Sequence, residues 1–328
     1  MADKLLEVRN LKKYFKTPRG NVHAVDNISF SINKGETLGI VGESGCGKST
    51  TGRAIIRLLE PTEGEILFEG KDIAKMNKRE LKEIRKEIQI IFQDPYSSLN
   101  PRMTVFETIA EPLKYHKIIP GASKQDINRR VAELMDTVGL AERLVNTYPH
   151  ELDGGRRQRI GIARALAVSP RFIVCDEPVS ALDVSIQAQI LNLLKELQKA
   201  HGLTFIFITH DLAVVKHFSD DIVVMYLGEV VEKAPADTLF ANPMHPYTKA
   251  LLSAILIPEV GANKERVALR GEIATPIDPP NECRFAKRCN YYCKDCDKGT
   301  PPLIEVAKNH FVACHCIGVG RNTLKLTM

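Results

Sequence analysis

Residues 42–49, with the sequence GESGCGKS, constrain the fold of this chain more than any other feature. They fit the phosphate-loop pattern G-x-x-x-x-G-K-[ST], follow the apolar run 37–41 and precede a helix predicted over residues 50–59. Glycines let the backbone wrap around an anion, and the following helix directs its positive dipole end to the same place. A chance glycine-rich turn is the alternative, but the strand-then-helix context favours a phosphate-binding α/β domain.

Within this loop the pattern assigns two side chains directly to the ligand. Lys48 is expected to reach the β- and γ-phosphates of a nucleotide, and the Ser49 hydroxyl is expected to ligate Mg²⁺. The remaining residues expected around the phosphates are Gly42, Glu43, Ser44, Gly45, Cys46, Gly47 and Thr50.

Composition narrows the class of protein further. The 328 residues suggest one large domain with an appendage, or two domains. No apolar stretch approaches the roughly 18–20 residues that span a bilayer, and the N-terminus lacks a charged-then-apolar leader, so we expect a cytosolic protein. The net charge is only +5, and the Lys and Arg residues are interspersed with Asp and Glu instead of forming a basic stripe, so no nucleic-acid partner is expected.

The periodicity of the chain predicts an α/β fold with three parts. Two β-like runs, 5–8 and 22–32, are separated by a loop containing Pro18 and Gly20 and indicate an antiparallel β subdomain. A mostly helical insertion is expected over about residues 101–165, with apolar positions at 3.6-residue spacing. Strand and helix signals alternate on either side of this insertion, which favours a parallel sheet covered by helices. These signals are strands at 64–68, 88–92, 172–175 and 204–208 and helices at 78–87 and 184–201, the last ended by Gly202.

Two further strands end in residues suited to nucleotide chemistry. The run 172–175 leads into Asp176 and Glu177, which can hold Mg²⁺ through water and polarise an attacking water respectively. The run 205–208 leads to His210, which we interpret as a γ-phosphate sensor. Surface carboxylates that merely end a strand, and a structural histidine, are the alternatives. Ligands of open α/β sheets bind at the edge where such strands end, which favours the functional interpretation.

Taken in order, these motifs resemble the nucleotide-binding subunits of ATP-binding cassette (ABC) transporters, over about residues 5–247. The resemblance implies a P-loop ATPase that hydrolyses ATP with Mg²⁺, using Lys48, Glu177 and His210. It further matches Tyr14 to the aromatic residue that stacks on adenine and Gln93 to the glutamine that contacts Mg²⁺. It also implies a head-to-tail pair of ATPases that sandwich ATP.

The segment that faces the partner's ATP in this family departs from the family pattern. The pattern Leu-Ser-Gly-Gly-Gln is here Leu-Asp-Gly-Gly-Arg, so the resemblance places Asp153, Gly154 and Gly155 against the partner's nucleotide. Asp183, in the matching Ser-Ala-Leu-Asp segment, is expected where the two ATPases touch. Asp153 is a good helix N-cap, which would be a purely structural role. Its carboxylate would, however, repel the partner's phosphate, because two charges about 4 Å apart interact by roughly 4 kcal/mol at an effective dielectric near 20. We therefore expect one ATP site to hydrolyse poorly, with Arg156 offsetting part of the repulsion, and a different ATPase as partner.

Residues 242–248 and the proline-punctuated tail resemble the C-terminal extension of the di- and oligopeptide importer ATPases, a group that includes nickel importers. Residues 52–62 resemble the ATPase of such heterodimers that is often given the letter F. The resemblance implies two membrane permeases, an extracytoplasmic peptide-binding protein and a peripheral location on the cytoplasmic side of the membrane. Nickel import, ABC ATPases that act on DNA or ribosomes, and ATP binding without hydrolysis are the alternatives. The sequence has neither the long coiled coils that DNA-repair ATPases need nor the second cassette that ribosome-associated ATPases usually carry.

Six of the eight cysteines lie in the last 50 residues, which indicates metal ligation in a cytosolic protein. Cys283, Cys289, Cys296 and Cys314 are similar to the cysteine pattern of this subgroup's tail, which implies a [4Fe-4S] cluster. Zinc is the alternative, because Cys293 and residues 314–316 offer further sulfur and nitrogen ligands. We therefore predict an ATPase domain over residues 1–257 and a cysteine-rich extension over residues 258–328. The first part of the extension, residues 258–280, is expected to be a linker.

Overall fold

The computed structural model describes residues 3–254, 269, 271 and 274–317 of the chain. It divides into two compact units, each built from several stretches of sequence. Unit 1 comprises Met1–Leu5, Asn33–Glu36 and Lys75–Ile208, and unit 2 comprises Leu6–Ile32, Thr37–Ala74 and Thr209–Met328. Most of the predicted linker lies outside the described residues, and the boundary at residue 257 stays a prediction.

The first sheet of unit 2 is antiparallel, with strand order β2-β1-β4-β5, as the sequence predicts for a β subdomain. Its strands are β1 Lys4–Thr17, β2 Gly20–Asn33, β4 Glu63–Phe68 and β5 Lys71–Asp72. Both β1 and β2 are longer than the apolar runs that predicted them, because backbone pairing continues through polar residues once a neighbouring strand is present. Most of the loop predicted between the two runs is therefore strand, and only Pro18 and Arg19 form a turn, with Gly20 as the first residue of β2.

The second sheet of unit 2 joins the phosphate-loop strand to the C-terminal segment, in the order β11-β12-β10-β9-β3. Strands β3 and β9 are parallel, and the other neighbours are antiparallel. These strands are β3 Thr37–Val41, β9 Asp221–Tyr226, β10 Glu229–Pro235, β11 Ile304–Ala307 and β12 His310–Val312. The helices of this unit are α1 Lys48–Ile55, α8 Leu212–Phe218, α9 Ala236–Ala241 and α10 Pro246–Ser253, with short 3-10 turns η4 Ala286–Arg288 and η5 Lys294–Asp297.

The C-terminal segment is therefore part of the sheet of unit 2. Glu232 of β10 is fully buried and accepts a hydrogen bond from the His310 Nε2 of β12 at 2.7 Å. The same carboxylate accepts backbone N–H groups of Met244 at 2.7 Å and His245 at 2.9 Å. A buried charge that is hydrogen-bonded on several sides is tolerated, so this contact fixes β12 and the start of α10 on β10.

The helix predicted over residues 50–59 is wrong at both ends, since α1 spans Lys48–Ile55. Arg57 has a positive φ of 54°, which a continuing helix excludes. Its guanidinium instead donates to the carbonyls of Ile73 at 2.9 Å and Ala74 at 2.7 Å, next to the 3-10 turn η1 Ile73–Lys75. A tertiary contact thus ends the helix earlier than its local sequence indicates.

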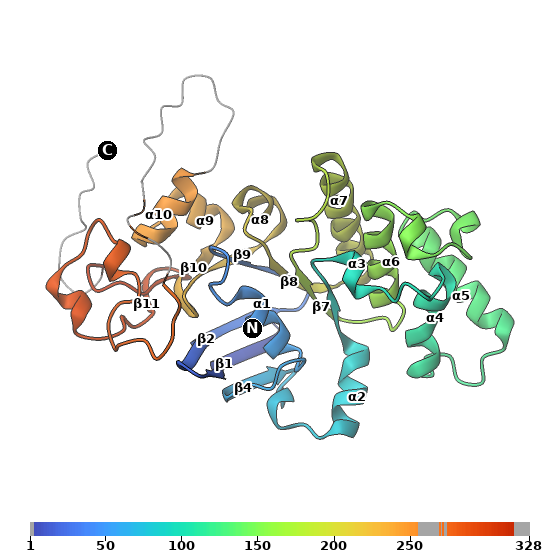
Figure 1. Ribbon diagram of the computed structural model, residues 1–328, viewed down its shortest axis with the longest axis horizontal. Coiled ribbons are helices and arrows are strands. Elements are labelled where there is room, and N and C mark those ends of the chain that lie inside the picture. Colours follow the sequence, from blue (N-terminus) through green and yellow to red (C-terminus); the bar gives the residue numbers. More distant parts are fainter. Residues whose placement is uncertain (1–2, 255–268, 270, 272–273, 318–328) are drawn as a thin grey trace. The chain divides into compact units, whose positions relative to one another are not determined.

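Unit 1 contains a parallel sheet with strand order β8-β7-β6 and a group of helices, as predicted. Its strands are β6 Ile88–Ile91, β7 Phe172–Asp176 and β8 Thr204–Ile208, and every residue of β7 and β8 is buried. Helices α4, α5 and α6 lie together in the predicted helical insertion (Figure 1). The helices are α2 Lys78–Glu87, α3 Pro95–Ser98, α4 Val105–Tyr115, α5 Lys124–Thr137, α6 Gly154–Leu166 and α7 Val184–His201, with 3-10 turns η2 Glu142–Leu144 and η3 Pro149–Glu151.

Candidate nucleotide site

The phosphate loop connects β3 to α1 and depends on glycine at two close approaches. Gly42 has φ 152°, and a Cβ there would lie 2.3 Å from the backbone oxygen of Met225. Gly47 has φ 104°, and its Cβ would lie 2.1 Å from the backbone oxygen of Ala24. Side chains are excluded at both positions, so the loop can hold its backbone N–H groups around an anion only with glycine there.

Lys48 begins α1 and is 4% exposed. Its Nζ donates to the carbonyl oxygens of Gly42 at 2.8 Å and Glu43 at 3.0 Å, so the ammonium lies inside the loop. Ser49 and Thr50 follow in the first helical turn, half-buried, where the helix dipole favours negative charge. The loop therefore collects a cation, hydroxyl groups and a helix N-terminus, a donor set that suits phosphate and Mg²⁺.

The side chain of Cys46 is buried, and burial raises the pKa of its thiol, so it remains neutral at physiological pH. Burial likewise raises the pKa of Cys175, which lies within β7.

Two more predicted site residues lie in unit 2. The Tyr14 hydroxyl donates to Asp26 Oδ1 at 2.5 Å, and its ring stacks on His23 with centroids 3.9 Å apart and planes at 19°. The backbone N–H of Thr209 donates to the carbonyl of Ile40 in β3 at 3.2 Å, which brings the next residue, the exposed His210, close to the strand that leads into the phosphate loop.

In unit 1 the structure brings two predicted residues together. Asp176 is the last residue of β7 and is fully buried, and Glu177 follows with a positive φ of 48°. Gln93, two residues beyond β6, donates from Nε2 to Glu177 Oε2 at 3.0 Å. A non-glycine residue in the left-handed region costs free energy and is found at functional sites.

The altered segment at residue 153 forms a helix start, as predicted. Asp153 is the N-cap of α6, with Oδ1 accepting the backbone N–H of Arg156 at 2.8 Å. The Arg156 Nε lies 3.4 Å from Asp153 Oδ2, so the two charges introduced into the family pattern face each other. This pair is half-exposed, and such pairs contribute about 0–1 kcal/mol to stability.

Leu182, just before α7, and Ile186, in the first turn of α7, pack against this helix start. A Cβ at Gly154 would lie 2.9 Å from Leu182, and one at Gly155 would lie 2.7 Å from Ile186. Asp183 is the N-cap residue of α7 and is exposed. The structure thus brings the predicted Gly154, Gly155 and Asp183 segments together within unit 1.

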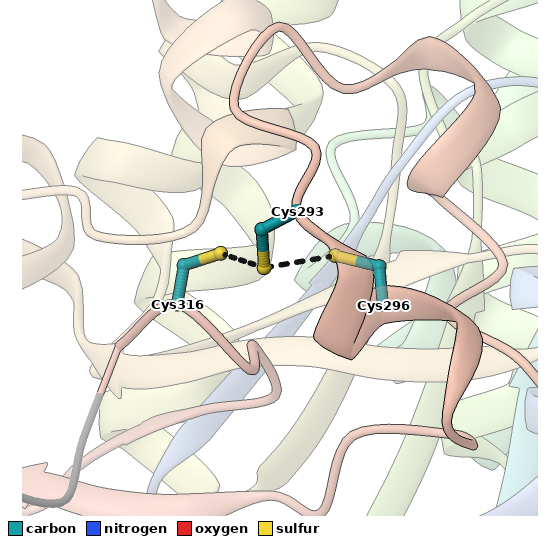
Figure 2. A group of neighbouring side chains, drawn as sticks. All are labelled: Cys293, Cys296 and Cys316. Atoms are coloured by element: carbon teal, nitrogen blue, oxygen red, sulfur yellow. Dashed lines mark hydrogen bonds between the residues drawn. The ribbon is translucent and has the colours of Figure 1, made fainter.

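The cysteines of the C-terminal segment gather in unit 2, with a trio different from the predicted four. Figure 2 shows Cys293 between Cys296 and Cys316, with Sγ atoms 3.7 Å and 2.9 Å apart. Among the described residues, these thiols form a group whose ligand atoms all lie within 4.8 Å of one another. Of the predicted cluster ligands, only Cys296 belongs to it.

The other predicted ligands lie close to the trio. Burial, with smaller contributions from negative charge on Cys296, Cys314 and Cys289, raises the pKa of Cys283 to about 12. Burial also raises the pKa of Cys289 to about 11. These thiols stay protonated unless a cation compensates the charge of the thiolate, so a metal ion that binds here would have to displace their protons.

Comparison with known proteins gives the family. The sequence model of the ABC transporter family matches residues 25–180. The oligopeptide transport ATP-binding protein OppF of Bacillus subtilis (strain 168) is 60% identical over 268 residues, covering 81% of this chain and 87% of that protein. This chain belongs to the ATP-binding subunits of ABC transporters. It is an ABC-type ATPase.

Other relatives support the same assignment for this ABC ATPase over its whole length. A second family model, the C-terminal region of oligopeptide/dipeptide transporters, matches residues 231–296. The oligopeptide transport ATP-binding protein AppF of Bacillus subtilis (strain 168) is 50% identical over 321 residues, covering 95% of this chain and 97% of that protein. No helix in the described part of the chain combines the length and the apolar character needed to cross a bilayer.

Solved structures agree with the fold of the ABC ATPase. The dimeric ATP-binding cassette MJ0796, in a post-hydrolysis state with ADP and Pi, gives a TM-score of 0.65 at 34% identity, covering 70% of this chain and 98% of that one. CbiO1 from Clostridium perfringens, part of the cbiONQ ABC transporter complex, gives a TM-score of 0.64 at 31% identity, covering 73% of this chain and 92% of that one.

Sequence reasoning missed the residues of unit 2 that support two of the predicted site residues, Tyr14 in β1 and Glu43 in the phosphate loop. Asp26 and His23 support Tyr14, and Tyr247 and Arg288 support Glu43. Arg288 is separated from Glu43 by 245 positions, so no local pattern links them.

Proposed function

We propose that this ABC ATPase powers the import of di- or oligopeptides across the cytoplasmic membrane. The observation that carries the proposal is similarity over up to 95% of the chain, cassette and C-terminal region together, to proteins named as oligopeptide transport ATP-binding proteins. A nickel importer is the alternative, because the chain does not itself contact the transported solute. ABC ATPases that act on DNA or ribosomes are a more distant alternative.

The phosphate loop would bind the triphosphate of ATP, with Lys48 on the β- and γ-phosphates and Tyr14 stacked on adenine. The position of the Lys48 ammonium among loop carbonyls supports this, since phosphate oxygens can replace those carbonyls as acceptors. Ser49, Gln93 and Asp176 would hold Mg²⁺. When bound, Mg²⁺ neutralises charge on the phosphate oxygens.

Glu177 would act as the general base that polarises the attacking water, and His210 would contact the γ-phosphate. The hydrogen bond from Gln93 supports the role of Glu177, because it holds the carboxylate in a fixed orientation, as a group that polarises a bound water molecule requires. The left-handed backbone of Glu177 also suits a residue held for chemistry rather than for packing.

Two such ATPases would sandwich ATP head to tail, with Asp153, Gly154 and Gly155 of this chain facing the partner's nucleotide and Asp183 at the contact. We propose a heterodimer in which the site that faces Asp153 hydrolyses ATP poorly. Arg156, 3.4 Å from Asp153, would offset part of the repulsion between this carboxylate and the γ-phosphate.

Glu177→Gln tests the assigned chemistry. The variant is expected to retain ATP and to lose turnover by at least about a hundredfold, the usual contribution of a general base. Glu196→Gln, an exposed position on α7, is the matched control and is expected to turn over ATP normally. Undiminished hydrolysis by the Glu177 variant would refute the role of this carboxylate.

The transport assignment places the chain on the cytoplasmic side of the membrane, bound to two permease subunits. Affinity purification from gently solubilised membranes tests it. Recovery of a second ATPase, two permeases and a peptide-binding protein supports the assignment, whereas ribosomes or DNA in the preparation would overturn it. Uptake of labelled peptide and uptake of labelled nickel are then measured in parallel, which distinguishes a peptide importer from a nickel importer.

We also propose that the cysteine-rich extension holds a [4Fe-4S] cluster on Cys283, Cys289, Cys296 and Cys314, with zinc as the alternative. The grouping of the cysteines supports metal ligation, since the backbone N–H of Cys283 donates to the carbonyl of Cys296 at 2.9 Å and the ligand atoms of Cys293, Cys296 and Cys316 all lie within 4.8 Å of one another. The 3.7 Å between Cys293 and Cys296 Sγ suits the alternative, since thiolates on one zinc lie about 3.8 Å apart. Anaerobic purification followed by iron, sulfide and zinc analysis decides, and zinc alone at one equivalent rejects the cluster.

A further inference from the structure

The segment between Cys283 and Cys289 is attached to the phosphate loop and to strand β2 of unit 2 by two buried arginines. The side chains of Arg284 and Arg288 are 7% and 8% exposed, although both carry a full charge. Between them, Phe285 packs edge-on against Tyr226, with ring centroids 5.2 Å apart. Charged side chains are buried this deeply only when they are paired, so their partners are informative.

Arg288 is paired with the phosphate loop. Its two terminal nitrogens donate to the two carboxylate oxygens of Glu43, at 2.6 Å and 3.1 Å. The guanidinium also lies over the ring of Tyr226, 5.8 Å from its centroid. The hydroxyl of Tyr247 accepts the backbone N–H of Glu43 at 2.8 Å, so both the side chain and the backbone of this loop residue are held from outside the loop.

Arg284 is paired with the support of the predicted adenine-stacking residue. It donates to Asp26 and to the carbonyl of Leu227, and its Nε lies 3.1 Å from Glu229. Asp26 also accepts the Tyr14 hydroxyl at 2.5 Å. The orientation of the Tyr14 ring therefore depends on a carboxylate that Arg284 neutralises.

The same carboxylate holds the neighbour on which Tyr14 stacks. His23 Nδ1 lies 2.8 Å from Asp26 Oδ2, so one side chain fixes both rings of the stack. Burial opposes ionisation of Asp26, but the hydrogen bonds from Tyr14 and His23 and the charge of Arg284 hold its pKa below the ordinary value. Asp26 is therefore a charged acceptor at physiological pH, and the charge of Arg284 offsets the cost of burying its carboxylate.

A forked guanidinium on a carboxylate fixes geometry as well as charge. Without Arg288, the carboxylate of Glu43 would stand unneutralised in the loop that receives a triphosphate, and it would repel that ligand. Without Arg284, Asp26 would lose its buried cation, and the ring held by Asp26 would lose its fixed orientation. The first loss acts on the phosphates and the second on the base.

We propose that Arg284 and Arg288 are positioning residues for ATP, through which the cysteine-rich extension sets the affinity of the nucleotide site. Arg288 acts on the phosphate loop through Glu43, and Arg284 acts on the adenine side through Asp26 and Tyr14. The inference rests on the proposed binding of ATP by this loop and Tyr14. It makes the extension a part of the nucleotide site rather than an appendage.

Equilibrium binding of two probes to the full-length chain tests the proposal, namely MgATP and inorganic tripolyphosphate, which lacks the base. Arg288→Ala is expected to raise the Kd of both probes about tenfold, the effect of a 1.4 kcal/mol interaction. Arg284→Ala is expected to raise the Kd of MgATP by a similar factor and to leave that of tripolyphosphate within about twofold. Lys287→Ala is the matched control, because this cation of the same segment is 81% exposed, and it should bind both probes like the wild type.

A second substitution separates positioning from simple loss of structure. Adding Glu43→Gln to Arg288→Ala removes the unneutralised carboxylate, so the Kd for tripolyphosphate should return to within about threefold of wild type. Arg288→Lys keeps the charge without the forked contact and should give an intermediate Kd; it carries the test if the alanine variant does not fold.

The outcomes distinguish this inference from the proposed function. A wild type that binds neither probe refutes the proposed nucleotide site and the inference with it. Normal ATP binding by wild type and by both arginine variants overturns the inference alone. Equal weakening of both probes by both arginine variants also overturns it, since that pattern indicates a structural role.

Discussion

We expect acidification to destabilise the protein through His245, the N-cap residue of α10. Its side chain is 1% exposed, and burial lowers its pKa from 6.5 to about 4. The neutral ring is required because its Nδ1 accepts the backbone N–H of Tyr247 at 3.1 Å. The unfolded chain takes up a proton near pH 6.5 and the folded chain only near pH 4, so stability present above pH 6.5 is lost as the pH falls between these values.

The size of this effect follows from the two pKa values. It amounts to about 2 kcal/mol at pH 5 and to about 3.4 kcal/mol well below pH 4. His245→Asn keeps an oxygen that can cap α10 and removes the titrating ring. Between about pH 7.5 and pH 5, the wild type should therefore lose about 2 kcal/mol more of its free energy of unfolding than the variant does.

Guanidinium unfolding followed by circular dichroism measures this difference, since the chain contains no tryptophan. Other titrating groups contribute equally to both proteins and cancel. His217→Asn, at an exposed position near the end of α8, is the control and should leave the pH dependence unchanged. Equal losses in the wild type and the His245 variant would refute the reasoning.

Three further predictions concern the nucleotide and cysteine sites. Gly47→Ala should weaken ATP binding at least about a hundredfold by calorimetry, because its Cβ would lie 2.1 Å from a backbone oxygen of β2; near-normal affinity would contradict the loop geometry. Asp153→Ser combined with Arg156→Gln should raise ATP turnover of the assembled complex by about tenfold, and no increase would count against the proposed asymmetry. Cys283→Ser should lose bound iron and Cys293→Ser should keep it, by metal analysis. Zinc that is lost from the Cys293 variant alone would assign the metal to the trio instead.

Much of the nucleotide chemistry could be predicted because it is encoded locally. The glycine spacing of the phosphate loop, the N-cap at Asp153 and the bounds of α7, ended by Gly202 at φ 62°, all depend on residues a few positions apart. The hydrogen bond between Gln93 and Glu177 was not predicted as a contact, although both residues were assigned to the site. Parallel strands bring their carboxyl ends to one edge, but which side chains meet there depends on packing.

The sequence by itself determined the phosphate loop, the order of the ATPase motifs and the cysteine-rich tail. Only the tertiary structure decided that this tail pairs with β10, that Arg288 holds Glu43 across 245 positions, and that Cys293 and Cys316 approach each other. The physical reason is the separation along the chain of the residues that interact. Backbone conformation and capping respond to neighbours in the chain, whereas a buried ion pair forms only where the whole fold brings two distant charges together and excludes water.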